Sequence, residues 1–150
     1  MSDTLGDLYQ QVILDHSRSP RNFRVLADAN RQAQGRNPLC GDQVHVYLRL
    51  DGDRVEDIAF QGSGCAISKA SASVMTTVLK GRSRAEVQAM FEKFHNTVTT
   101  GKSPDGEKLA VFAGVHKFPA RVKCAILPWH AVMAALEGKT DPVTTENENP

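Results

Sequence analysis

The stretch from residue 44 to residue 60 reads VHVYLRLDGDRVEDIAF and predicts a β-hairpin. In its first half, valines and leucines alternate with His, Tyr and Arg, which is the period-two pattern of a strand with one buried face. Asp51-Gly52-Asp53 is a strong turn signal, and residues 54–60 form the returning strand. We therefore expect a small antiparallel sheet, to which residues 31–37 add a third strand.

Helical patterns flank this hairpin. Apolar residues recur at helical spacing over residues 5–17, and Ser19-Pro20 ends that helix because the residue before a proline avoids the helical region. Four more helices are expected after the hairpin: residues 66–80 before Gly81, a helix opened by the capping box Ser83–Glu86, residues 107–113 closed by Gly114, and a last helix starting at Pro119. Between them, residues 99–106 read as a polar loop. The pattern predicts one α+β domain over residues 1–137, followed by a polar, disordered tail over residues 138–150.

The composition is that of an ordinary globular domain. Hydrophobic residues make up 41% and charged residues 23% of the 150-residue chain, and the net charge is only +1. This near-neutral charge gives no indication of a nucleic acid partner. No apolar run approaches the roughly 18 residues of a membrane span. The start, Met1-Ser2-Asp3-Thr4, lacks the basic-then-apolar layout of a secretory signal, so we expect a cytoplasmic protein.

The three cysteines lie in contexts that favour reactive thiolates. Cys40 lies in a turn-rich stretch before a strand, Cys65 directly precedes a predicted helix, and Cys124 lies in the first turns of the last helix. The amino end of a helix lowers a thiol pKa, and Arg121 and Lys123 beside Cys124 would add to this effect. We therefore expect exposed, reactive thiols, although three buried cysteines acting as small hydrophobic residues are the plainer alternative.

Asp42 adds an oxygen ligand to these three sulfurs. If Gly41 makes a tight turn, the side chains of Cys40 and Asp42 can point to the same side of the chain. Three thiolates and one carboxylate suit tetrahedral zinc, and thiolates also suit iron–sulfur clusters. The four candidate ligands come from three separate segments, so their spacing alone leaves the buried-cysteine alternative open.

Pro128 complicates the last helix. A proline at this position cannot donate a hydrogen bond to the carbonyl of Cys124, four residues earlier. Either the helix kinks here or that carbonyl finds another partner. The geometry around Cys124 therefore cannot be predicted from the helical pattern.

Three ordered motifs make the chain resemble the IscU/NifU-type iron–sulfur cluster assembly proteins, most closely their SufU branch. The motifs are Asn37-Pro38-Leu39-Cys40-Gly41-Asp42, Gly62-Ser63-Gly64-Cys65 and Lys117–Ala125, and the resemblance spans residues 5–137. It implies an α+β fold with a three-stranded antiparallel sheet packed with about five helices. It also implies that Cys40, Asp42, Cys65 and Cys124 meet at one end of the domain and bind metal.

The resemblance also implies a function. Its expected partner is a pyridoxal-phosphate-dependent, SufS-like cysteine desulfurase that hands over persulfide sulfur, with other cluster assembly proteins as further partners. Cys40 would accept the sulfur, and we name Cys40 and Arg121 as the catalytic residues. Lys123 replaces the histidine that scaffold-type members carry before the last cysteine, and residues 96–114 resemble an insertion of the SufU branch. Both features favour a zinc-dependent sulfurtransferase that stimulates its desulfurase.

Two other functions stay open. One is a scaffold that assembles and transfers a [2Fe–2S] or [4Fe–4S] cluster, in which case the cofactor is the cluster rather than Zn²⁺. The other is a small zinc-stabilised binding module without sulfur chemistry. A purely structural site needs no exposed acceptor thiol, so the thiolate-favouring contexts argue against the binding module.

Overall fold

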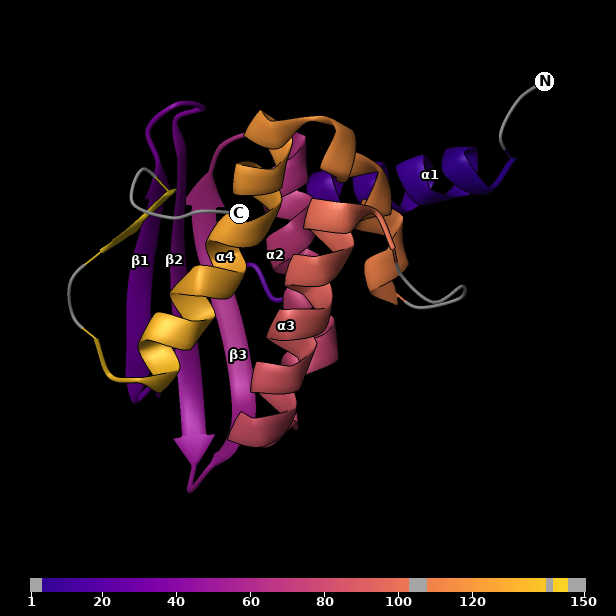
Figure 1. Ribbon diagram of the computed structural model, residues 1–150. Helices are drawn as coiled ribbons and strands as arrows, with labels where there is room; N and C mark the ends of the chain where they lie inside the picture. Colours follow the sequence, from indigo (N-terminus) through magenta and orange to yellow (C-terminus); the bar gives the residue numbers. More distant parts are fainter. Residues whose placement is uncertain (1–3, 103–107, 140–141, 146–150) are drawn as a thin grey trace.

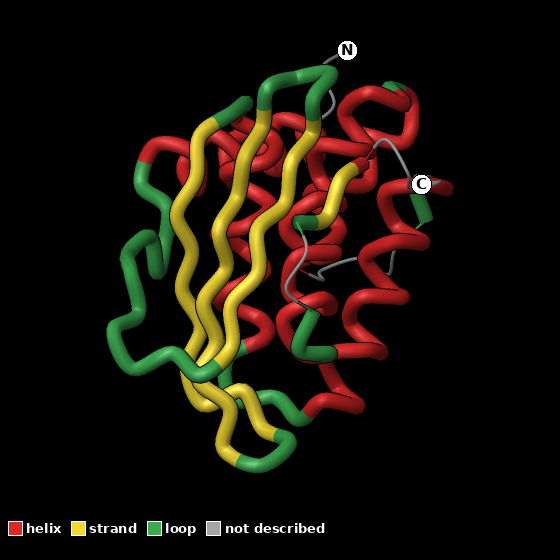
Figure 2. Tube along the Cα trace, turned by 90° about the vertical axis from the view of Figure 1, so that its left-hand side faces the viewer, coloured by secondary structure: helices red, strands yellow, loops and turns green. Residues whose placement is uncertain are grey.

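The computed structural model describes residues 4–102, 108–139 and 142–145, and its helices lie against one face of a β-sheet (Figures 1 and 2). The sheet has the strand order β3-β2-β1-β4. The elements in chain order are α1 (Thr4–Arg18), β1 (Arg31–Asn37), β2 (Asp42–Asp51), β3 (Arg54–Ser63), α2 (Ala66–Leu79), α3 (Arg84–Thr100), the 3₁₀ helix η1 (Lys108–Lys117), α4 (Pro119–Leu136) and β4 (Val143–Thr144). The α+β class expected from the sequence is confirmed.

The predicted hairpin is confirmed in strands β2 and β3. They pair antiparallel with Val46 opposite Phe60 and Leu48 opposite Ile58, and all four side chains are buried. Gly52 has a φ of +63°, which the tight turn between the strands requires and which glycine adopts without strain. Strand β1 pairs antiparallel with β2, also as expected.

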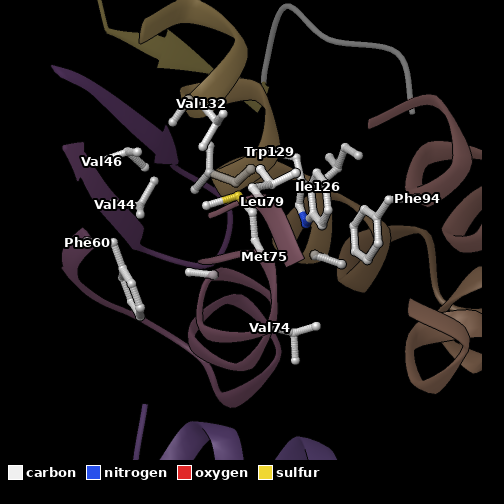
Figure 3. Close-up of a cluster of buried hydrophobic side chains, with 14 of the residues drawn as sticks. Val44, Val46, Phe60, Val74, Met75, Leu79, Phe94, Ile126, Trp129 and Val132 are labelled. Atoms are coloured by element: carbon white, nitrogen blue, oxygen red, sulfur yellow. The ribbon is translucent and has the colours of Figure 1, made fainter. Parts of the chain in front are cut away.

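The core lies between the sheet and helices α2, α3 and α4 (Figure 3). Trp129 of α4 stacks on Phe94 of α3 with ring centroids 4.5 Å apart, and Met75 and Leu79 of α2 pack in the same cluster. Burying such a side chain contributes about 1.5–3 kcal/mol. No helix in the described ranges is both long enough and apolar enough to cross a membrane.

Helix α3 is longer than its sequence pattern suggested. Residues 99–106 were expected to form a loop, but the helix runs to Thr100 and ends at Gly101, whose φ is +77°. The hydroxyls of Thr99 and Thr100 donate to the carbonyls of His95 and Asn96. These polar side chains therefore form hydrogen bonds within the helix, and the two residues belong to its last turn. Residues 103–107 of the expected loop lie outside the described residues.

The next helix also extends past its expected end. It was predicted over residues 107–113 and is a 3₁₀ helix over Lys108–Lys117, so Gly114 does not close it. The chain leaves it at Phe118, whose N–H donates to the carbonyl of Val115, and Pro119 then opens α4 as predicted.

The sheet has a fourth strand that the sequence did not reveal. We expected three antiparallel strands and a tail from residue 138, but Val143–Thr144 pairs parallel with β1 at Gly35 and Arg36. The sheet is therefore mixed. Thr145, the next residue, is 1% exposed, which shows that this part of the tail packs on the domain. The expected disorder of residues 140–141 and 146–150 falls outside the described residues.

Candidate metal centre

The three segments that carry the candidate ligands meet at one end of the sheet. The turn between β1 and β2, the start of α2 and the start of α4 all lie at this end (Figure 1). The Sγ atoms of Cys124 and Cys40 are 3.4 Å apart, and the Sγ of Cys65 lies 3.9 Å from Oδ2 of Asp42. Ligand atoms of Cys40, Asp42 and Cys124 all lie within 4.8 Å of one another, with Cys65 beside Asp42.

Two glycines allow this approach. Gly41 has a φ of +72°, so the chain turns sharply between Cys40 and Asp42. Gly64 has a φ of +148°, and a Cβ at this position would lie 2.2 Å from Oδ1 of Asp42. A residue with a side chain would therefore displace the carboxylate.

Asp42 is buried and its carboxylate is held from two sides. Oδ1 accepts a hydrogen bond of 2.8 Å from the backbone N–H of Cys65. Oδ2 lies 3.4 Å from the side-chain nitrogen of Asn37 and faces the Cys65 sulfur. One carboxylate oxygen is thus fixed by the backbone, while the other points toward the thiols.

Asn37 is a site residue that the sequence reasoning missed. It is fully buried, and its Nδ2 lies 3.5 Å from the Sγ of Cys124 as well as 3.4 Å from Asp42. Its Oδ1 accepts a hydrogen bond of 3.0 Å from the hydroxyl of Thr145. The available signal was its place in the same motif as Cys40 and Asp42, at an inward position of β1.

The cysteine thiols differ sharply in their acidity. Cys65 is the N-cap of α2, and its sulfur accepts the N–H of Ser68. A hydrogen bond from the Cys124 thiol and these backbone donors lower the pKa of Cys65. The Cys65 sulfur, burial and the neighbouring Asp42 and Cys40 raise the pKa of Cys124.

The expectation of an exposed Cys124 thiolate is therefore wrong. Its side chain is buried, and the acidic groups crowded around it favour the protonated form. Arg121 and Lys123, which were expected to offset this, make no side-chain hydrogen bond or ion pair in the described part of the chain. Cys65 is partly exposed and Cys40 is exposed, as expected for both.

Arg121 lies beside the candidate ligands rather than on them. It is exposed and lines a groove of about 640 Å³ between α1, η1 and the starts of α2 and α4, together with Ile13, Ile67 and Phe118. Ala66, which follows Cys65, also lines this groove. Arg121 therefore lines the same groove as the start of α2, whose N-cap is Cys65.

Helix α4 continues through Pro128 and gains a bond to α2. The hydroxyl of Ser71 donates to the carbonyl of Ala125 at 2.5 Å and lies 3.2 Å from the indole Nε1 of Trp129. This link holds the turn that follows Cys124 against α2, whose N-cap is Cys65. The two helix-borne cysteines are thereby fixed relative to each other.

The chemistry of this donor set fits a zinc ion. Four-coordinate tetrahedral zinc with Zn–S bonds of about 2.3 Å separates two sulfur ligands by about 3.8 Å. The Cys124–Cys40 distance of 3.4 Å is slightly shorter than this value. The Cys65–Asp42 distance of 3.9 Å is slightly longer than the roughly 3.6 Å expected between a sulfur and an oxygen ligand. A divalent cation would also relieve the crowding of acidic groups that raises the pKa of Cys124.

Comparison with known proteins gives consistent matches over most of the chain. The model of the NifU-like N-terminal domain family matches residues 8–125. The zinc-dependent sulfurtransferase SufU of Bacillus subtilis is 44% identical over 132 residues, covering 85% of this chain and 88% of that protein. The iron–sulfur cluster assembly scaffold protein IscU of Streptococcus pyogenes is 40% identical over 136 residues, covering 89% of this chain and 85% of that protein.

A solved structure supports the fold independently. It is the crystal structure of a candidate iron–sulfur cluster assembly scaffold protein for the SUF system, FiSufU, from Fervidobacterium islandicum. It superposes with a TM-score of 0.77 at 35% sequence identity and covers 84% of this chain and 94% of that chain.

Proposed function

The chain belongs to the family of NifU-like N-terminal domains, and from this premise we propose that it is a zinc-binding sulfurtransferase in iron–sulfur cluster assembly. Its sulfur would come from the persulfide of a pyridoxal-phosphate-dependent, SufS-like cysteine desulfurase. The proposal assigns Cys40, Asp42, Cys65 and Cys124 as the metal ligands. Other cluster assembly proteins would take the sulfur onward.

One observation supports this proposal above all: ligand atoms of Cys40, Asp42 and Cys124 lie within 4.8 Å of one another, and the Cys65 sulfur lies 3.9 Å from Asp42. The relative from Bacillus subtilis, named a zinc-dependent sulfurtransferase, supports zinc as the ion. A bound zinc ion would keep the thiols deprotonated at neutral pH. Oδ2 of Asp42, which faces the Cys65 sulfur and lies 3.4 Å from Nδ2 of Asn37, would be the fourth ligand.

Cys40 is the proposed sulfur acceptor because it is the most accessible of the three thiols. It lies in the exposed turn between β1 and β2, next to Leu39, which is 71% exposed. In the transfer step the Cys40 thiolate attacks the outer sulfur of the desulfurase persulfide. A new S–S bond forms on Cys40, the old S–S bond breaks, and the desulfurase cysteine leaves as a thiolate, so no outside oxidant or reductant is needed.

Arg121 is the proposed second catalytic residue. Its exposed guanidinium lies on the rim from which a partner would reach the ligand end, and it could pair with an anionic group of that partner. It would act on the incoming sulfur donor rather than on the metal, since it makes no hydrogen bond or ion pair with the ligand side chains in the described residues.

A cluster scaffold is the second candidate function. The Streptococcus pyogenes relative at 40% identity is named a scaffold protein. Thiolates are ligands of iron–sulfur clusters as well as of zinc. Lys123, where scaffold-type members carry a histidine, favours the sulfurtransferase. A lysine at this position supplies no neutral ring nitrogen for a metal.

Metal analysis and a sulfur-transfer assay together test the proposal. The purified protein should contain about one zinc per chain, stimulate a cysteine desulfurase, and gain the mass of one sulfur atom on the peptide that contains Cys40. Cys40→Ala should keep part of its zinc and accept no sulfur, whereas Cys65→Ala should lose most of its zinc. A brown protein with iron and labile sulfide and no stimulation would favour the scaffold, and a Cys40→Ala variant that accepts sulfur normally would remove Cys40 from its role.

A further inference from the structure

We infer that Thr145 is a positioning residue of the metal centre, which it controls through Asn37. The inference rests on the proposed metal site but concerns a residue outside every ligand motif. Thr145 follows strand β4, far from the ligands in sequence, and its hydroxyl donates to Oδ1 of Asn37 at 3.0 Å. The other end of the same amide faces Asp42 and Cys124.

The three residues form a buried chain of hydrogen bonds. Asn37 is 0% exposed, Thr145 and Asp42 are each 1% exposed, and water therefore cannot replace a lost partner without rearrangement. A buried acceptor without a donor is costly, so Oδ1 of Asn37 depends on the Thr145 hydroxyl. Nδ2 is then left to donate to Oδ2 of Asp42 and toward the Cys124 sulfur.

The direction of the amide matters because its two ends are chemically opposite. Nδ2 is a donor and suits the anionic carboxylate of Asp42, whereas Oδ1 is an acceptor and would repel that carboxylate. Without the Thr145 hydroxyl, the amide would have to turn toward another donor to satisfy Oδ1. Such a turn would withdraw Nδ2 from Asp42 and release the carboxylate from its ligating position.

Strand β4 explains how Thr145 reaches this place. Val143 pairs with Gly35 and Thr144 with Arg36 in parallel register, so the next step along both strands brings Thr145 beside Asn37. A side chain at Gly35 would meet Leu127 of α4 at 3.0 Å, so β1 lies close against the helix that carries Cys124. Residues 143–145 thus lie at the ligand end of the sheet and support it.

The test compares Thr145→Val, which keeps the shape but removes the donor, with Thr145→Ser, which keeps the donor. Thr97→Val is the matched control, because Thr97 is also buried and its hydroxyl donates, among the described residues, only to the carbonyl of Lys93 within α3. Co²⁺ titration, followed by the thiolate-to-cobalt absorption band, gives the affinity of each protein. We expect Thr145→Val to bind Co²⁺ about 10-fold more weakly than the wild type, the low end of the usual effect of losing such a partner. Thr145→Ser and Thr97→Val should stay within about twofold of it.

A double-mutant cycle separates positioning from general damage to the fold. If Thr145 acts through Asn37, Thr145→Val should weaken Co²⁺ binding no further in an Asn37→Ala background. An equal extra loss in that background, or a folded Thr145→Val with wild-type affinity, would overturn the inference. If Thr145→Val does not fold, Thr145→Ala makes the same comparison with a smaller side chain.

A readout without metal keeps this inference distinct from the proposed function. In the metal-free protein, the side-chain amide protons of Asn37 should exchange with solvent faster in Thr145→Val than in the wild type, as measured by NMR. Unchanged exchange would contradict the inference. A wild-type protein that binds no Co²⁺ would instead contradict the proposed function and leave this exchange measurement as the deciding test.

Discussion

Replacing Gly64 by alanine should disable the metal centre while leaving most of the fold in place. The added Cβ would lie 2.2 Å from Oδ1 and 3.0 Å from Cα of Asp42, where ordinary contact begins at 3.4 Å. The carboxylate oxygen must therefore move by about 1.2 Å, judged from the closest approach of nonbonded atoms. It cannot escape by rotation alone, because the backbone of Asp42 is also too close.

The expected cost follows from two sources. Alanine at a φ of +148° is strained, which costs about 1–3 kcal/mol. Moving the carboxylate breaks its 2.8 Å hydrogen bond with the Cys65 N–H, and a hydrogen bond to a charged group is worth about 1.5–3 kcal/mol. We expect the free energy of unfolding to fall by about 2–5 kcal/mol, since the two losses partly overlap.

The effect on metal binding should exceed the effect on stability. With Asp42 displaced, the site keeps three thiols but loses its oxygen ligand, and zinc affinity should drop by about 100-fold or more. Chelator competition measures the affinity, and urea unfolding measures the stability. Gly114→Ala is the control, because a Cβ at Gly114 meets nothing within 4 Å. If Gly64→Ala is folded and binds zinc as tightly as Gly114→Ala, the assignment of Asp42 as a ligand is refuted.

Two further predictions concern the thiols and the helix that carries Cys124. In the metal-free protein, iodoacetamide should alkylate Cys65 at pH values well below the ordinary thiol pKa. The lowered pKa of Cys65 keeps its thiolate populated as the pH falls. Cys124 should stay unmodified there, and peptide mass spectrometry would show an equal rate if this reasoning were wrong. Ser71→Ala should lower the free energy of unfolding by about 1–3 kcal/mol, since the indole of Trp129 and the carbonyl of Ala125 lose a buried partner. An unchanged urea midpoint would show that Ser71 does not hold α4.

Local signals predicted the framework of this protein well. The alternation in residues 44–60, the capping box at Ser83 and the proline at the start of α4 each act within a few residues, and all three are borne out. The predicted ends of helices α3 and η1 were wrong, because the sequence signals for where a helix stops are weak. Thr99 and Thr100 read as loop residues from their polarity, but their hydroxyls can bond within the helix equally well.

The candidate site was harder to predict because its character depends on distant residues. Flanking cations suggested a reactive Cys124, yet burial and the approach of Cys65, Asp42 and Cys40 raise its pKa. The hydrogen bond between Asn37 and Thr145 joins residues 108 positions apart in the chain, and no local pattern marks it. Strand β4 has only two residues, too few for any periodicity to reveal.

The proposed ligands also differ in how firmly the fold holds them, and this difference bears on the proposed chemistry. Cys65 is fixed as the N-cap of α2, and Cys124 is buried in a helix that is bonded to α2. Cys40 lies between exposed Leu39 and Gly41, where even an added Cβ would meet nothing within 4 Å. A sulfur acceptor must move away from the other metal ligands to reach a partner. The Cys40 thiol, which lies in an open turn, can do so without unfolding a helix. The geometry therefore favours Cys40 as the moving thiol and the two helix-borne cysteines as the permanent anchors.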